Sequence, residues 1–472
     1  MRHGARDFLI SASQSGATNV LAALVSVGGT LLFPRLLGVT DFSYWQLYVF
    51  YIGYVGVLQF GWNDGMYLRY GGRHYDSLDR GVFAGQFRLL IATQLLVGGA
   101  LAATAAWLAP EPERAFVVGM TGVATLLLGG RSFLLLLCQA TNLIARYARI
   151  LAVESILFIA LVTAWFGFGG TGFRALIVCD LIAKGGSFVL ASVWCRDLVL
   201  ARVPRGEPVL PEAWRSIVVG VKLMLANLSS ILMIGVVRFA IERHWSVVVF
   251  GKVSLSLSLS NIFMVFVNAV GVVVFPTLRR LDPARKPQLF LAFRCVYMVA
   301  ALAALLVFFP LRVVLAAWLP DYAETLAYLA VLFPAFVFEG RMALLITSFL
   351  KDLRAERSLL LVNAGGVLLA VAAALVTVGW LGDLNLAVGS ILGLIVVRAT
   401  VAELVLWRIL RVSAWTGLLA ELAVTAVFVV VAVVVPAWPA AGWYGLAWVC
   451  YLLLSGRRLI SATRFVRTLV MG

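Results

Sequence analysis

Long runs of apolar residues, each sufficient to cross a bilayer, alternate along this chain with short polar segments. A run of about 18 or more apolar residues predicts a membrane-spanning helix, because a helix of that length crosses the hydrocarbon core. Every backbone polar group inside hydrocarbon must be hydrogen-bonded within the protein, which favours helices throughout. The pattern predicts fourteen spans, at 9–33, 44–66, 83–109, 115–140, 150–168, 172–195, 215–241, 247–275, 290–316, 324–350, 358–381, 386–409, 417–436 and 440–455.

The composition agrees with this pattern. Hydrophobic residues make up 62% of the 472 residues and charged residues only 13%, whereas about a quarter of the residues of a soluble domain are charged. A soluble globular protein is therefore excluded, and an all-α polytopic membrane protein is predicted. The basic segment Met1–Asp7 precedes a first span that has no small-residue cleavage site, so we expect that span to remain as a helix.

The net charge of +16 is unevenly distributed. Lys and Arg concentrate in alternate connections, including 69–80, 146–149 and 196–205, and in the C-terminal tail. The positive-inside rule then places both termini in the cytoplasm. Contact with anionic lipid headgroups explains the basic connections, so a nucleic-acid partner is not expected.

The two halves of the chain resemble each other. The pair Gly130-Arg131 lies deep in an apolar span, and Gly340-Arg341 occupies the matching place 210 residues later. Asn19 and Asn227 are separated by 208 residues. We therefore expect two pseudo-symmetric six-helix lobes that are parallel repeats, because an even number of spans gives both lobes the same orientation. Substrate is then expected in a cleft between the lobes, with alternating access.

These observations divide the chain into four parts. They are an N-terminal lobe (1–196), a cytoplasmic linker (197–214), a C-terminal lobe (215–411), and a final part with two added helices and a basic tail (412–472).

Two stretches carry a resemblance to a known family. They are TLLFPRLLGVTDFSYWQLYVF at Thr30–Phe50 and FGWNDGMYLRYGG at Phe60–Gly72. With the 6 + 6 + 2 helix pattern, the chain resembles the polysaccharide flippases of the multidrug/oligosaccharidyl-lipid/polysaccharide exporter superfamily. The resemblance implies translocation of a polyprenyl-pyrophosphate-linked oligosaccharide across the bacterial cytoplasmic membrane, for cell-surface polysaccharide biosynthesis. It also implies an ion gradient or the membrane potential as the drive, no cofactor, and a polysaccharide polymerase or ligase as a partner.

The sequence also allows other functions. Lipid II flippases of the same superfamily have cavity arginines on the first helix, whereas the span 9–33 has none, which argues against peptidoglycan precursors. A multidrug or other lipid exporter of the same fold is the main alternative. A membrane enzyme of envelope polymer synthesis is less favoured, because the three histidines are isolated and no long loop could hold catalytic groups. The five cysteines have no metal-site spacing.

The basic groups within the spans are the candidates for binding an anionic cargo. An arginine presents a fork of donors that binds phosphate oxygens in pairs. The alternative is that each arginine forms an internal ion pair that duplication has preserved. For Arg88 and Arg294 we expect the side chains to extend toward the headgroups. The proposed substrate-binding residues are Arg131, Arg341, Lys222, Lys252, Arg398, Gln14, Asn19 and Asn227.

Acidic residues within the spans could couple transport to an ion gradient, because a carboxylate in a low dielectric readily takes up a proton. The candidates are Asp64, Glu154, Glu339 and Glu403. Asp180 and Lys184 are spaced i, i+4, which predicts a structural salt bridge. The couples Glu339/Arg341 and Arg398/Glu403 are two and five residues apart and share no helix face, so their acids need partners elsewhere.

Overall fold

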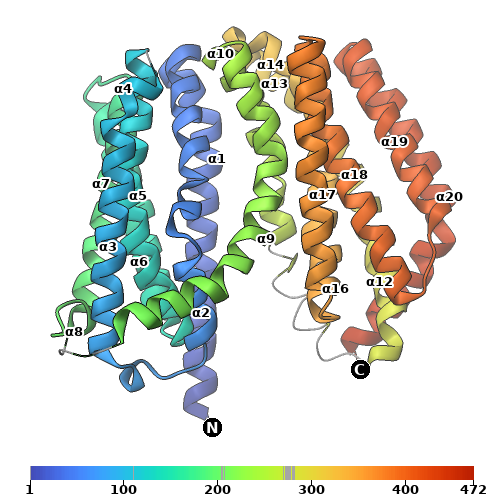
Figure 1. Cartoon of the computed structure of the whole chain (residues 1–472). Coiled ribbons are helices and arrows are strands. Elements are labelled where there is room, and N and C mark those ends of the chain that lie inside the picture. Colours follow the sequence, from blue (N-terminus) through green and yellow to red (C-terminus); the bar gives the residue numbers. More distant parts are fainter. Residues whose placement is uncertain are drawn as a thin grey trace. The chain divides into compact units, whose positions relative to one another are not determined.

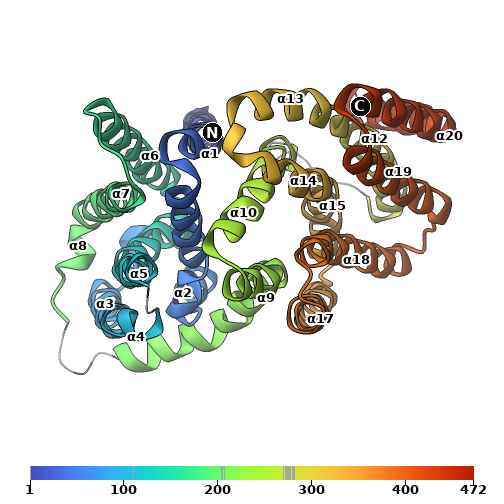
Figure 2. The same cartoon turned by 90° about the horizontal axis from the view of Figure 1, so that it is seen from above.

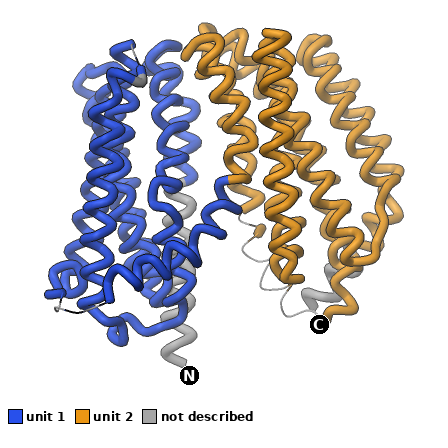
Figure 3. The backbone as a smooth tube through the Cα atoms, viewed as in Figure 1, with its two compact units in different colours: residues 1–228 blue, residues 229–472 orange. Residues whose placement is uncertain are grey.

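The computed structural model describes the side chains of residues 23–464, except 108, 110, 204, 205, 207, 269, 272–277, 279–281 and 463. Nearly all the described residues lie in helices, and none of them lies in a β-strand. The all-α prediction is therefore confirmed. The chain divides into two compact units, residues 1–228 and 229–472 (Figure 3).

The first unit begins with a long helix and ends inside another, α9 (Val209–His244), which continues into the second unit. The predicted linker 197–214 is thus helical at its beginning, in α8, and from Val209 onward. The other elements of this unit are α1 (Arg2–Ile52), η1 (Val55–Gln59), α2 (Trp62–Tyr70), η2 (Tyr75–Ser77), α3 (Arg80–Ala103), α4 (Ala105–Leu108), α5 (Pro112–Ala140), α6 (Ile144–Gly167), α7 (Phe173–Trp194) and α8 (Arg196–Val199) (Figure 1).

The second unit contains more interrupted helices. Two short π-helical stretches, η6 (Met342–Ile346) and η7 (Leu375–Trp380), lie within longer helical segments. The other elements are α10 (Val247–Asn261), η3 (Pro283–Arg285), α12 (Lys286–Ala304), η4 (Leu305–Val307), α13 (Phe308–Trp318), η5 (Pro320–Tyr322), α14 (Ala323–Leu332), α15 (Ala335–Arg341), α16 (Thr347–Asp352), α17 (Glu356–Ala374), α18 (Leu384–Leu410), α19 (Trp415–Val434) and α20 (Ala437–Met471).

Within the described residues, ten helices are long and apolar enough to cross a membrane. The number is eleven if the bent pair Pro320–Leu332 and Ala335–Asp352, which meet at 41°, forms one span. The chain is therefore a multi-pass membrane protein. The count of fourteen spans and the cytoplasmic termini stay predictions.

The second predicted span, 44–66, is broken. Its first part belongs to α1, which is continuous with the preceding predicted span except for a non-helical backbone at Gly38 (φ 75°, ψ 175°). The chain then passes through η1 and resumes as α2, with positive φ at both Phe60 and Gly61. A break inside a bilayer is tolerated only where other groups satisfy the exposed backbone.

Polar side chains support this break. The Gln94 side chain of α3 donates a hydrogen bond to the Leu58 carbonyl oxygen (2.9 Å). The Asn63 amide donates to the Gln59 side chain (2.7 Å) and to the Gly129 carbonyl oxygen of α5 (3.2 Å). All three side chains are buried. In the second unit, α10 likewise ends at Asn261, well before the predicted end of the span 247–275.

The core of the first unit forms around α5. This helix packs against α3, α7, α6, α2 and α1, and it lies among them when the unit is seen along the helix axes (Figure 2). Its buried residues Phe133 and Leu137 join a cluster with Phe83 and Phe87 of α3. These large side chains supply much of the contact area between α3 and α5.

The last two helices pack on the second unit. α20 lies along α12, and the Tyr444 hydroxyl donates to the Leu302 carbonyl oxygen (2.7 Å). Phe428 of α19 packs in contact with the rings of Phe308 and Phe309 of α13. The two added helices are thus part of the second unit's core.

Glycines allow α2 and α9 to touch backbone to backbone. A Cβ atom on Gly65 would collide with the Ser216 carbonyl oxygen and lie 2.9 Å from the Gly220 nitrogen. Beside this contact, Arg69 of α2 forms an ion pair with Glu212 of α9 (2.5 Å). The contact therefore requires glycine, since the backbone cannot move aside as a flexible side chain can.

We predict that Gly65→Ala lowers the stability of the protein by about 1–3 kcal/mol, which is the usual effect of inserting an atom into a packed region. The midpoint of thermal unfolding of the detergent-purified protein measures this loss. Gly99→Ala is the matched control, because Gly99 lies in helix α3 and a Cβ there would meet no atom within 4 Å. Equal midpoints for the two variants would contradict the close α2–α9 contact.

Candidate functional site

Five polar side chains of four helices meet in the first unit. Arg131 of α5 forms an ion pair with Glu154 of α6, and Lys184 of α7 lies 3.9 Å from the same carboxylate. Lys184 also pairs with Asp180, as its i, i+4 spacing predicts, so that prediction is confirmed. The Tyr48 hydroxyl of α1 donates to the second oxygen of Asp180 (2.7 Å).

This cluster contains two cations and two carboxylates, so its formal charges cancel. Its charged side chains are between 12% and 19% exposed. Charges held away from water need partners, because the cost of leaving one alone is several kcal/mol. Arg131 therefore already has an internal partner, and it could bind a phosphate only in exchange for Glu154 or in addition to it.

A second cluster lies in the core of the second unit. Arg341 of α15 is fully buried and lies 2.9 Å from Glu403 of α18 and 3.3 Å from Glu421 of α19. Arg294 of α12 pairs with both carboxylates, at 2.8 Å from Glu421. The Tyr451 hydroxyl of α20 donates to Glu421 (3.3 Å). Two arginines and two glutamates again cancel in charge.

The prediction for the Arg294 side chain is wrong. Its side chain was predicted to extend toward the headgroups, but it is 6% exposed and is directed toward Glu403 and Glu421. The reason is that helices far apart in sequence bring two acids beside it, which no local pattern could show. Arg88, at the matching place in the first unit, is exposed and donates to the Ala201 carbonyl oxygen (2.7 Å).

The acids that lacked a partner on their own helix find one on the neighbouring helix. Arg398 of α18 binds both oxygens of Glu339 of α15, at 2.6 and 2.7 Å. It also donates to the Ser230 hydroxyl (3.1 Å). Each acid therefore pairs with the arginine of the other helix. Glu339 of α15 pairs with Arg398 of α18, and Glu403 of α18 pairs with Arg341 of α15.

The two Gly-Arg pairs have similar packing around the glycine, but their arginines pair with acids of different helices. A Cβ on Gly130 would lie 2.7 Å from the Ile91 side chain, and a Cβ on Gly340 would collide with the Tyr297 hydroxyl. In both units the glycine thus admits a side chain of the preceding span. The arginine that follows pairs with acids of α6 in one unit and of α18 and α19 in the other.

The remaining candidate cations have different surroundings. Lys252 of α10 pairs with Glu324 (2.6 Å), an acid that is 70% exposed. Lys222 and Asn227 of α9 are exposed, and within the described residues Lys222 has no ion pair or hydrogen bond. Gln14 and Asn19 lie outside the residues whose side chains the structure describes.

Of the four candidate coupling acids, three have basic partners: Glu154, Glu339 and Glu403. Asp64 of α2 has none within the described residues and is half-buried. It lies in the first turn of α2, in the second part of the broken span 44–66. Asp64 is thus the acid whose protonation breaks no ion pair.

Glu421 is the charged residue of these clusters that the sequence analysis missed. It is the only charged residue of the predicted span 417–436. A lone ionisable residue inside an apolar span usually has a specific partner, and that signal was available. The identity of the partners was not available, because Arg294 and Arg341 lie 127 and 80 residues away.

We predict that Arg398→Leu alone destabilises the protein by about 3 kcal/mol, because it leaves Glu339 without its cation. The double variant Glu339→Leu/Arg398→Leu should recover most of this loss, since no uncompensated charge remains. Chemical unfolding in detergent measures both. If the double variant is no more stable than the single one, the pair is not the reason for the position of Arg398.

No protein-family model and no curated protein sequence matches the chain. Among solved structures it is similar to a lipid II flippase, MurJ, in an inward closed conformation, with a TM-score of 0.64 and 12% identity over 96% of this chain and 100% of that one. It is also similar to a MOP superfamily transporter from Pyrococcus furiosus, with a TM-score of 0.45 and 11% identity over 86% and 94% of the two chains. The first similarity shows that the chain has the all-helical fold of that flippase.

Proposed function

We propose that this protein is a flippase that moves a polyprenyl-pyrophosphate-linked oligosaccharide across the bacterial cytoplasmic membrane, as a member of the polysaccharide flippases of the exporter superfamily. The supporting observation is the fold shared with a lipid II flippase over 96% of the chain. Fold alone does not select a cargo. The choice of cargo rests on the resemblance of Thr30–Phe50 and Phe60–Gly72 to those flippases.

The ion pairs narrow the choice of residues that bind the cargo. Arg131, Arg341 and Arg398 each have a carboxylate partner, so a pyrophosphate would have to compete with it. Lys222 is different, because it is exposed on an apolar helix without a described partner. A lysine in such a place is costly unless it meets water or an anion. We propose Lys222 as the first contact for the pyrophosphate, with Asn227 on the same helix as a neutral donor.

The drive is proposed to be an ion gradient or the membrane potential. Asp64 is the favoured coupling acid, because its protonation leaves every described ion pair intact. Glu154, Glu339 and Glu403 would each release a buried cation on protonation, which is the more expensive event. The sequence predicts a central cleft between the lobes with basic groups that bind the cargo, and this cationic cavity remains a prediction.

The test is the distribution of the lipid-linked glycan between the two leaflets, in cells with and without the protein. Loss of the protein should leave the glycan in the cytoplasmic leaflet. Lys222→Gln should slow translocation about tenfold, because it removes a charge-assisted hydrogen bond worth about 1.5 kcal/mol. Lys351→Gln is the matched control, since Lys351 is also an exposed lysine but lies near the end of α16.

Three other outcomes would redirect the proposal. Normal translocation by Lys222→Gln, in cells that need the protein, would remove Lys222 from the site but leave the flippase function. A normal leaflet distribution without the protein, together with altered drug sensitivity, would favour an exporter. A changed glycan composition without a change of leaflet would favour an enzyme.

A further inference from the structure

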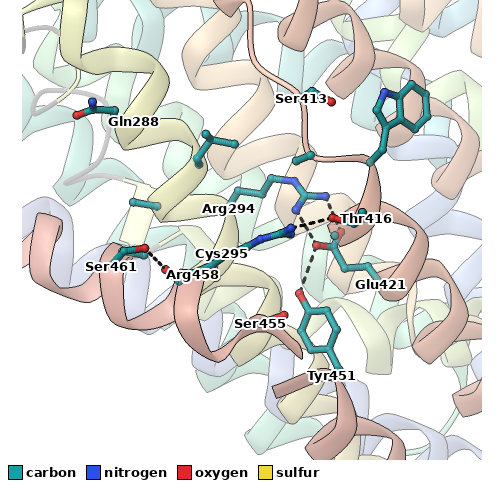
Figure 4. Close-up of a pocket in the computed structure, with 16 residues that line it drawn as sticks. Gln288, Arg294, Cys295, Ser413, Thr416, Glu421, Tyr451, Ser455, Arg458 and Ser461 are labelled. Carbon is teal, nitrogen blue, oxygen red and sulfur yellow. Dashed lines mark hydrogen bonds and ion pairs between the residues drawn. The ribbon is translucent and has the colours of Figure 1, made fainter. Parts of the chain in front are cut away.

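A cavity of about 570 Å³ lies within the second unit, between α12, α19 and α20 (Figure 4). The segment Ser413–Thr416, where α19 begins, forms part of its wall. The polar side chains that carry the argument are Gln288, Arg294, Ser413, Thr416, Glu421 and Arg458. The cavity belongs to one unit, and none of the proposed cargo-binding residues lines it.

Glu421 is the only acidic residue among the described residues of this lining, and it already forms ion pairs. Its carboxylate binds Arg294 on one side and Arg341 on the other, and it accepts a hydrogen bond from Tyr451. Arg294 is likewise held by Glu421 and Glu403. Arg294 and Glu421 therefore form a neutral part of the wall that has few groups left to bind a ligand.

Arg458 has a different role in the lining. Its guanidinium donates to the Thr416 hydroxyl (2.8 Å), a neutral partner, and no described carboxylate forms an ion pair with it. It lies 3.4 Å from the place of a Cβ on Gly417, in the same small region as Arg294. Ser413 and Gln288 add polar groups elsewhere in the lining (Figure 4). The lining thus has an excess of positive charge and of donors, which is the condition for binding an anion.

The surroundings favour phosphate as the anion. Arg408, Arg411, Arg457 and Arg464 belong to the basic connections and tail that the positive-inside rule assigns to the cytoplasm. Basic pockets between helices on that side bind anionic lipid headgroups. Trp415 and Leu291 of the lining are 53% and 36% exposed, so apolar surface is available for an acyl chain beside the polar donors.

We propose that this cavity binds a phosphate group at Arg458, and that the phosphate is the headgroup of an acidic phospholipid. Arg458 is the binding residue, because its planar fork can take two phosphate oxygens. Thr416 orients it, and the neutralised Arg294–Glu421 pair closes the inner wall. A free phosphate would use the same donors, so the experiment has to separate the two sources.

The experiment uses the full-length protein in detergent and native mass spectrometry. Dioleoyl phosphatidylglycerol and phosphatidylcholine are the lipid probes, and inorganic phosphate is the soluble competitor. We expect phosphatidylglycerol to bind more tightly than phosphatidylcholine. Arg458→Gln should weaken its binding about tenfold, the loss of one charge-assisted contact. Arg458→Lys should weaken it less, because the charge remains but the fork is lost.

Arg457→Gln is the matched control, since Arg457 is the adjacent exposed arginine and is absent from the lining. It should change phosphatidylglycerol binding little. Binding of inorganic phosphate that excludes phosphatidylglycerol in Arg457→Gln and is lost in Arg458→Gln would identify a soluble phosphate as the ligand and overturn the lipid assignment. Equal weakening by the two glutamine variants, or equal binding of the two lipids, would overturn the proposal.

Discussion

The cost of a charge inside a bilayer is the constraint on which this structure depends. Arg294, Arg341 and Arg398 are buried, and each binds a carboxylate that comes from a different helix. Because an unpaired charge there would cost several kcal/mol, each pair fixes which two helices are neighbours. Apolar helices in lipid have no comparable preference for one another, since lipid tails are as apolar as their side chains. The ion pairs therefore contribute specificity to the packing rather than net stability.

This constraint explains how the last two helices became part of the core. The sequence predicts no counterpart for them in the first half of the chain, yet α19 supplies Glu421 to both Arg294 and Arg341, and α20 supplies Tyr451 to Glu421. In the first unit the corresponding arginine, Arg131, relies on Glu154 of α6 instead. The second unit's arginines thus have acids from both α18 and α19, whereas Arg131 pairs with an acid of α6. They also complete the cavity beside Arg458.

Neutralisation of the buried arginines also bears on the proposed transport. A positive charge that holds two helices together is poorly suited to release a cargo in each cycle. Lys222 and Arg458 have no described carboxylate partner, so an anionic ligand could reach them without such competition. The break between η1 and α2 also has buried polar groups with partners. Gln94 and Asn63 donate hydrogen bonds to backbone carbonyl oxygens that would otherwise be unsatisfied in hydrocarbon.

The sequence by itself determined the fold class, most of the apolar spans and the charges inside them, because hydrophobicity and the cost of burying charge are properties of each residue and its near neighbours. It also determined the Asp180–Lys184 pair, whose partners are one turn apart. Only the tertiary structure decided that Arg294 is buried on Glu403 and Glu421, that Glu339 belongs to Arg398, and that the span 44–66 is broken. Those outcomes depend on residues that lie between 36 and 127 positions apart, and no periodic pattern links positions so distant.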